Sequence, residues 1–233
     1  MTQDTNQLPD VIRDIERVPA DIAAQAGKFQ AAILADVNGR RGALHGRISP
    51  VAPTMKVAGP AITVDVRPGD NLMIHAAIAI AQPGDVLVID GKGDQTSALM
   101  GAIMMNQCKV MGLAGVIVDG AIRDVEELRE LGFPVFSFGT NPNGPTKAVS
   151  GRVNWPVTVG GVAVKPGDLV VGDADGVVVI EREKAASLLA PAAKKLDDET
   201  KRIQGILDRK QLRPSWLDGA LRTAGVLKEG ETL

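Results

Sequence analysis

The sequence lacks several features that characterise common classes of protein. It contains one cysteine, Cys108, no tyrosine, four phenylalanines and two tryptophans among 233 residues. A single cysteine excludes an intramolecular disulfide and a zinc site built from cysteines. The scarcity of aromatic side chains argues against a platform on which bases or sugars stack.

Charge and hydropathy argue against two further classes. The net charge is −2, and acidic and basic residues alternate along the chain, so we predict no basic surface for nucleic acid. No run of about 18 apolar residues occurs, and the first ten residues, MTQDTNQLPD, are polar. We therefore expect a cytoplasmic protein that binds neither nucleic acid nor a membrane.

Length and apolar content favour a globular protein. Hydrophobic residues make up 45 % of the 233 residues, enough for a sizeable core. We expect a single domain over residues 1–211 that includes a charged helix over 181–211, followed by an irregular extension over 212–233.

Local patterns predict alternating helices and strands. Apolar spacing and alanine-rich composition predict helices over 10–37, 71–81 (with Asp70 as N-cap), 97–110 and 124–131. Runs of β-branched residues predict strands over 57–66, 86–90, 114–119, 134–138, 157–164 (a hairpin turning at Gly-Gly), from 169, and over 177–180. This order favours a layered α/β fold with a mixed sheet.

The stretch VIVDGAIRDVEEL, residues 116–128, places two opposite charges beyond a predicted strand end at Asp119-Gly120. Functional groups in α/β sheets collect just past the carboxyl ends of strands. Asp124 also stands where a helix begins, so it has a second interpretation as an N-cap with Arg123 as a solvated neighbour. Composition alone favours the N-cap.

Two other segments contain candidate residues. The strand over 86–90 runs into Gly91-Lys92-Gly93, but Thr96 replaces the third glycine of a dinucleotide fingerprint. With a helix predicted to start near Ser97, this loop is a fair place for a small carboxylate instead. His75 lies in an apolar helix, where a lone histidine is more often structural.

Four stretches together resemble one enzyme family. They are GPAITV from Gly59, PGDNLMIH from Pro68, PGDVLVIDG from Pro83 and GLAGVIVDGAIRDVEEL from Gly112. Over about residues 15–205 the sequence closely resembles the class II pyruvate aldolases that cleave 4-hydroxy-4-methyl-2-oxoglutarate and 4-carboxy-4-hydroxy-2-oxoadipate. That family shares its fold with the regulator of ribonuclease E activity A (RraA).

The resemblance implies a fold and an assembly. The fold is an RraA-like α-β-β-α sandwich similar to the swivelling phosphohistidine domain. The assembly is a homotrimer, or a homohexamer of two trimers, with active sites between subunits.

The resemblance also implies site residues. Asp124 takes the position of the carboxylate that binds Mg²⁺ or Mn²⁺, and Arg123 that of the arginine that steadies the enolate oxygen. The other implied positions are Gly101, Ala102 and Ile103, whose amides bind the substrate carboxylate, Glu199, which reaches a neighbouring subunit's metal through water, and His75, a candidate catalytic residue near the site.

The implied reaction is a retro-aldol cleavage. A base removes the C4 hydroxyl proton, the C3–C4 bond breaks, and the enolate is protonated to pyruvate, with metal-bound water as the expected proton carrier. The metal acts as a Lewis acid. The same enolate chemistry predicts decarboxylation of oxaloacetate as a side activity.

One position departs from the family pattern. The family places an acidic residue 21 positions before the arginine, where this chain has Ala102. Loss of such an acid can cost about 10–100-fold in metal affinity or activity. A weaker metal site, substitution by another acid such as Asp94, and a different substrate all stay open.

Two other functions compete with the aldolase. A ribonuclease regulator on the same fold is the main alternative, which Ala102 favours and the Arg123-Asp124 pair disfavours. A demethylmenaquinone methyltransferase finds no support in the sequence, because no glycine-rich cofactor loop of the right form occurs.

Overall fold

The computed structural model describes residues 10–233. The chain forms two compact units that divide between Ala192 and Ala193. The first unit contains the sheet and the helices α1 (Ala20–Ala26), α2 (Ala31–Val37), α3 (Leu72–Ile80), α4 (Ala102–Val110) and α5 (Val125–Leu131). The helix α6 (Arg182–Leu207) begins in the first unit, and the second unit also contains α7 (Leu217–Thr223).

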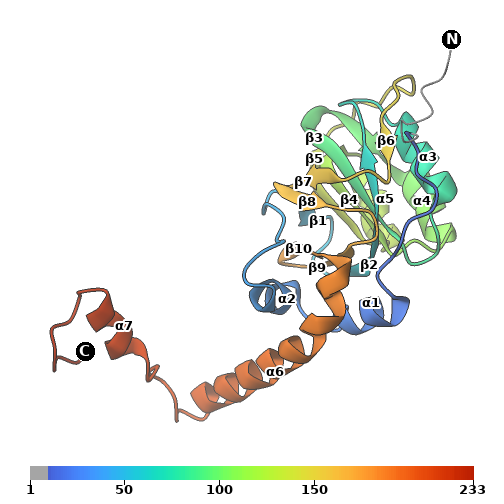
Figure 1. Cartoon of the computed structure of the whole chain (residues 1–233). Helices are drawn as coiled ribbons and strands as arrows, with labels where there is room; N and C mark the ends of the chain where they lie inside the picture. Colours follow the sequence, from blue (N-terminus) through green and yellow to red (C-terminus); the bar gives the residue numbers. More distant parts are fainter. Residues whose placement is uncertain (1–9) are drawn as a thin grey trace, which may run out of the picture. The chain divides into compact units, whose positions relative to one another are not determined.

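A mixed sheet organises the first unit (Figure 1). Its strands follow the order β1-β5-β4-β3-β2-β9-β10, and β6 pairs with β2 beside this path. The strands are β1 (Ser49–Pro50), β2 (Val57–Asp65), β3 (Val86–Met100), β4 (Gly115–Ile122), β5 (Val135–Thr140), β6 (Arg152–Val153), β9 (Leu169–Asp173) and β10 (Gly176–Ile180). A separate hairpin joins β7 (Val157–Val159) to β8 (Val162–Val164).

The strands β2, β3, β4 and β5 pair in parallel, whereas β9 is antiparallel to β2. The segments over which β2, β3 and β4 first pair are almost entirely buried, which is typical of a parallel sheet covered on both faces. Parallel strands end at the same edge of a sheet. The segments that follow β3 and β4 therefore lie close together.

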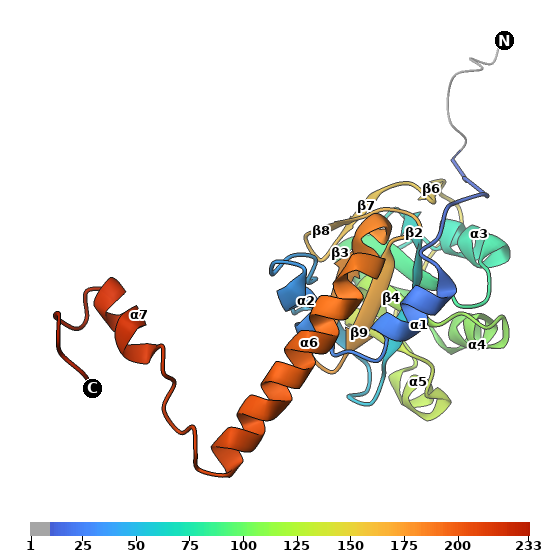
Figure 2. The ribbon, with the colours of Figure 1, turned by 60° about the horizontal axis from the view of Figure 1, so that its bottom comes forward.

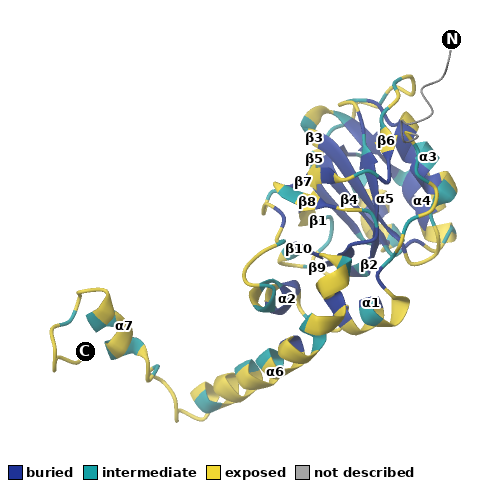
Figure 3. Cartoon of the chain, in the orientation of Figure 1, coloured by how far each residue is buried: buried dark blue, intermediate teal, exposed yellow. Residues whose placement is uncertain are grey.

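Three hydrophobic clusters lie between the layers of the first unit. One lies between the sheet and α3, α4 and α5, and includes Ile74, Met105 and Leu128. A second packs Phe136 of β5 with valines of the β7–β8 hairpin and of β9 and β10. The third lies between β9–β10 and the helices α1, α2 and the start of α6. Figure 2 shows α3, α4 and α5 together on one side of the sheet, and Figure 3 shows the buried strands between the layers. The predicted layered α/β fold is confirmed.

The predicted helix over 10–37 is wrong in its first part. Residues 11–19 are not helical, because their backbone groups bond to distant segments: the Ile12 amide donates to the Val153 carbonyl over 3.1 Å. Pro19 at the N-cap of α1 also disfavours helix for the residue before it. Arg17 anchors this segment through a two-pronged ion pair with the buried Asp85, at 2.8 and 3.0 Å.

Two predicted boundaries beside the sheet are also wrong. The strand β3 continues to Met100, so the predicted helix over 97–110 begins at Ala102. The strand β4 likewise continues past Gly120 to Ile122, because the ends of β3 and β4 pair with each other through register shifts. Gly91-Lys92-Gly93 therefore lies within β3, and no helix begins directly after it. The predicted carboxylate site, which needs a helix N-terminus beside this segment, is therefore wrong.

The C-terminal part also differs from the prediction. Residues 212–233 are predicted to be irregular, yet they contain α7. No helix among residues 10–233 is long and apolar enough to cross a membrane.

A buried carboxylate joins the start of α3 to the loop over 141–151. Asp70, which is 2 % exposed, accepts hydrogen bonds from the Leu72 amide at 3.0 Å and the Thr146 hydroxyl at 2.7 Å. The amides of Ala148 and Val149 donate to the same carboxylate, at 2.7 and 3.2 Å. The N-cap of α3 is Asn71, so the predicted N-cap at Asp70 is one residue too early, although the Asp70 carboxylate does accept a hydrogen bond from the first amide of the helix. The same carboxylate also holds the loop against the helix.

These bonds make folding dependent on the charge of Asp70. Burial alone would raise the pKa of the carboxyl group, but the hydrogen bonds from Thr146, Ala148, Leu72 and Val149 outweigh it and lower the pKa to about 2. Because the folded-state pKa is depressed, the stabilisation is present above the unfolded value near 3.8 and is lost as the pH falls toward 2.

We predict that Asp70→Asn lowers the free energy of unfolding by about 2 kcal/mol at neutral pH. The difference from the wild type should shrink as the pH falls from about 4 to 2, which urea denaturation across this range measures. Glu126→Gln, at an exposed carboxylate, is the control and should change little. A difference that does not vary with pH would contradict the prediction.

Candidate active site

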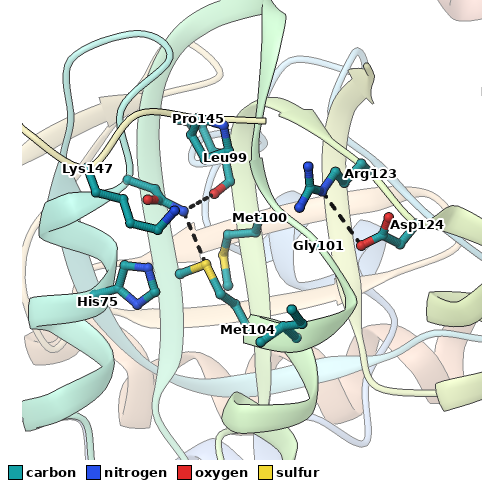
Figure 4. A pocket seen from close by; sticks show the side chains of 11 residues that line it. His75, Leu99, Met100, Gly101, Met104, Arg123, Asp124, Pro145 and Lys147 are labelled. Carbon is teal, nitrogen blue, oxygen red and sulfur yellow. Dashed lines mark hydrogen bonds and ion pairs between the residues drawn. The ribbon is translucent and has the colours of Figure 1, made fainter. Parts of the chain in front are cut away.

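A pocket of about 120 Å³ lies where α3, the end of β3, the start of α4 and the end of β4 meet (Figure 4). The loop over 141–151 contributes to one side of it. The lining residues are Asn71, His75, Leu99, Met100, Gly101, Ile103, Met104, Arg123, Asp124, Pro145 and Lys147. Five of the predicted site residues, His75, Gly101, Ile103, Arg123 and Asp124, therefore share one pocket.

Asp124 has a left-handed backbone, with φ 62° and ψ 41°. Such a conformation is uncommon outside glycine, although aspartate and asparagine tolerate it best. Asp124 occupies the N-cap position of α5, but its side chain makes no capping bond to that helix. The carboxylate oxygen Oδ2 instead accepts a hydrogen bond of 2.8 Å from the Ala102 amide at the start of α4. Asp124 therefore stands at the N-cap position of α5, but its side chain does not cap that helix and bonds to the start of α4 instead.

Arg123 lies beside this carboxylate. Its Nε atom is 3.8 Å from Oδ2 of Asp124, and the two side chains are 41 % and 34 % exposed. Its amide donates to the Met100 carbonyl, which ties the residue to the end of β3. At this distance and exposure the ion pair is weak, so the guanidinium can bind another anion.

Gly101 allows the close approach of these groups. A Cβ atom on Gly101 would lie 2.3 Å from Oδ2 of Asp124 and 2.9 Å from Cγ of Arg123. The backbone of Gly101 is extended and suits any residue, so the requirement for glycine is one of space. The bond between Asp124 and the Ala102 amide therefore depends on the missing side chain at position 101.

The start of α4 lies at the pocket. The first amides of a helix have no acceptor within the helix. Of the three predicted carboxylate-binding positions, Gly101 and Ile103 line the pocket, whereas the Ala102 amide is engaged by Asp124. Ile103 is 84 % exposed, so the start of α4 is open to solvent at this residue.

The opposite side of the pocket contains the predicted residue His75 and two residues that sequence reasoning missed, Asn71 and Lys147. Figure 4 shows His75 and Lys147 together on this side, away from Arg123 and Asp124. Asn71 also lines the pocket and is 3 % exposed. An asparagine at a helix start resembles a cap, and Lys147 lies in a loop without regular pattern, so neither gave a usable signal.

Two other predicted residues do not line this pocket. The carboxylate of Asp94 accepts hydrogen bonds from Thr96 and is not among the lining residues. Glu199 belongs to the second unit, where its carboxylate pairs with Lys195 at 3.0 Å. Its role toward a neighbouring subunit stays a prediction.

The donor atoms fit a hydrated divalent cation better than a fully coordinated one. No group of three or more His, Cys, Asp or Glu side chains among residues 10–233 could hold a metal ion. The pocket offers Asp124, whose Oδ1 atom has no hydrogen-bond partner in the same range. Mg²⁺ keeps several waters and takes one or two carboxylates plus substrate oxygens, so one carboxylate suffices. A structural zinc site does not fit.

Comparison with known proteins identifies the family. The model of the RraA-like family, described as Aldolase/RraA, matches residues 11–179. A protein of Halalkalibacterium halodurans, named "Putative 4-hydroxy-4-methyl-2-oxoglutarate aldolase", is 45 % identical over 165 residues, which cover 71 % of this chain and 79 % of that protein.

Solved structures show the same fold. Streptomyces coelicolor RraAS2, described as an unusual member of the RNase ES inhibitor RraA family, superposes with a TM-score of 0.74 at 30 % identity, over 80 % of this chain and 98 % of that one. A Geobacillus kaustophilus protein described as an S-adenosylmethionine: 2-dimethylmenaquinone methyltransferase gives 0.61 at 34 % identity, over 65 % and 94 %. With the family model matching most of its length, the chain belongs to the RraA-like family of aldolases and RraA proteins.

Proposed function

We propose that this chain is a divalent-metal-dependent lyase that releases pyruvate from a 4-hydroxy-2-oxo acid by retro-aldol cleavage. The substrate is 4-hydroxy-4-methyl-2-oxoglutarate or 4-carboxy-4-hydroxy-2-oxoadipate. The observation that carries the proposal is the Asp124 carboxylate, held in a left-handed turn between Arg123 and the start of α4. The name of the Halalkalibacterium relative supports an aldolase.

The pyruvoyl end of the substrate binds at the Arg123 side of the pocket. The amides at the start of α4 donate hydrogen bonds to its carboxylate, since a helix N-terminus attracts anions. Arg123 then lies beside the 2-oxo group, where negative charge develops as the enolate forms. A fixed positive charge at that place stabilises the transition state more than the ground state.

Asp124 holds the cation, Mg²⁺ or Mn²⁺, through its free Oδ1 atom. When bound, the metal supplies Lewis-acid stabilisation of the 2-oxo group. The Ala102 amide orients the carboxylate through Oδ2, so the metal-binding atom is fixed relative to α4.

The leaving half of the substrate lies toward His75 and Lys147. Lys147 is exposed and presents a positive charge to the distal carboxylate. The Nε2 atom of His75 is buried without a hydrogen-bond partner among the described residues, so His75 is the base that receives the C4 hydroxyl proton. The C3–C4 electron pair becomes the enolate, and the proton returns to C3. Oxaloacetate would form the same enolate, so we propose its decarboxylation as a side activity.

The assembly proposed for this function is a homotrimer or a homohexamer of two trimers. Glu199 would then reach the metal of a neighbouring subunit through water. Its position on α6, exposed enough to pair with Lys195, allows such a contact.

We expect purified protein with Mg²⁺ to release pyruvate from at least one of the two hydroxy acids, and from oxaloacetate, in a coupled lactate dehydrogenase assay. EDTA should abolish the activity. Asp124→Asn, which tolerates the left-handed backbone, should lower kcat/KM by more than about 100-fold.

The alternative is a non-catalytic binding protein, a regulator like the RNase ES inhibitor family to which the Streptomyces structure belongs. It predicts no pyruvate from any of the three acids with Mg²⁺ or Mn²⁺. That result would favour a direct binding assay against a ribonuclease of the RNase E type.

The space requirement at Gly101 gives a second prediction. Gly101→Ala should push the Asp124 carboxylate away from the Ala102 amide and lower kcat/KM by about 100-fold, as misplacement of a catalytic group by about 1 Å does. Gly46→Ala is the matched control, because a Cβ there meets no atom within 4 Å. If both variants keep wild-type activity, the close approach has no catalytic importance.

Ala102 gives a third prediction. Ala102→Asp should restore the acid of the family pattern and tighten Mn²⁺ binding by about 10–100-fold in isothermal titration calorimetry. Ala102→Asn is the uncharged control and should not reproduce the gain. Unchanged affinity in Ala102→Asp would show that this side chain does not act on the metal.

A further inference from the structure

Two buried polar atoms on one face of α3 have no hydrogen-bond partner among residues 10–233. They are Oδ1 of Asn71 and Nε2 of His75, and both residues line the pocket. Residues four apart along a helix lie one above the other, with Cβ atoms about 5–6 Å apart. The two unpartnered atoms therefore belong to one small region of the pocket wall.

The orientation of the Asn71 amide is determined by its donors. The Nδ2 atom donates to the Leu99 carbonyl at 2.9 Å and to Sδ of Met104 at 3.3 Å. Both hydrogens of the amide nitrogen are thus used. Oδ1 is left as an acceptor, and a flip of the amide would place two acceptors against each other at Leu99.

An asparagine at a helix start usually caps the helix with this oxygen. In α3 Asn71 occupies the N-cap position but its side chain makes no capping bond, while the first helical amide, that of Leu72, donates to the Asp70 carboxylate. The Oδ1 atom of Asn71 therefore accepts no hydrogen bond from the described residues. Leaving a buried acceptor without a partner is unfavourable, so a donor from outside the chain is expected at this place.

We propose that Asn71 and His75 hold a water molecule that relays the proton between the substrate's C4 hydroxyl and His75. This inference rests on the proposed lyase function and makes Asn71 a positioning residue for it. Water fits because it has two hydrogens for two acceptors: one for Oδ1 of Asn71 and one for Nε2 of the neutral imidazole. Its oxygen then accepts from the hydroxyl, which gives the three partners typical of a buried water.

The step balances. The water oxygen takes the hydroxyl proton while the water gives its own hydrogen to Nε2 of His75, and its second hydrogen stays on Asn71. The C4–O bond becomes a carbonyl, and the C3–C4 electron pair becomes the pyruvate enolate. The proton then returns from the imidazolium through the same water to C3.

Direct transfer from the hydroxyl to His75 is the competing arrangement. It would leave the Asn71 acceptor unsatisfied throughout the reaction, because the only hydroxyl hydrogen would go to the imidazole. Asn71 has no proton-accepting chemistry of its own. The relay therefore uses both unpartnered atoms, whereas direct transfer uses one.

The test compares two substrates in Asn71→Leu, which keeps the approximate volume and removes both the Oδ1 acceptor and the Nδ2 donor. Cleavage of the hydroxy acid removes a hydroxyl proton, whereas the bond-breaking step of oxaloacetate decarboxylation removes none. We expect kcat for the hydroxy acid to fall by about 100-fold, with KM and oxaloacetate decarboxylation little changed. An equal loss with both substrates would indicate a structural role and overturn the relay.

A proton inventory on the wild type avoids any effect of a variant on folding. The dependence of kcat on the deuterium fraction of the solvent should curve as two transferred protons require. A straight line, which indicates one proton, would remove the relay and leave the lyase standing. A wild type that releases no pyruvate from either hydroxy acid would remove the proposed function, and the relay with it.

Discussion

The geometry of the pocket depends on one hydrogen bond, from the Ala102 amide to the Asp124 carboxylate. It joins the end of β4 to the start of α4 and uses a helix amide that has no partner of its own. A glycine at 101 makes room for it, and extended pairing of β3 with β4 brings the two strand ends together. A negative charge is thereby held at a helix N-terminus, where the helix dipole stabilises it.

The far wall of the pocket depends on a different carboxylate. Asp70 joins the loop that contains Lys147 to the helix that contains His75, and it accepts a hydrogen bond from the first amide of that helix. The two walls are therefore built by the same device, an aspartate that bonds to backbone amides of a neighbouring segment. One of these aspartates is buried and structural, whereas the other stays partly open to a ligand.

Sequence reasoning worked where local chemistry decides the structure. The β-branched run over 57–66 formed β2, and Arg123 and Asp124 lie together in the pocket. It failed where distant pairing decides: Lys92 and its flanking glycines resemble a loop, yet β3 runs through them because β4 pairs alongside. Asn71 was missed because its side chain bonds to Leu99 and Met104, which are distant from it in the sequence.

Asp124 has both a left-handed backbone and a carboxylate side chain, and these two features place different requirements on the residue at this position. The turn itself tolerates glycine, asparagine or aspartate, whereas the proposed cation binding requires a carboxylate. A single-base change of an aspartate codon can produce either glycine or asparagine at little steric cost. The fold is thus more tolerant at this position than the proposed chemistry, so a lineage could lose the carboxylate here and still keep a well-folded protein.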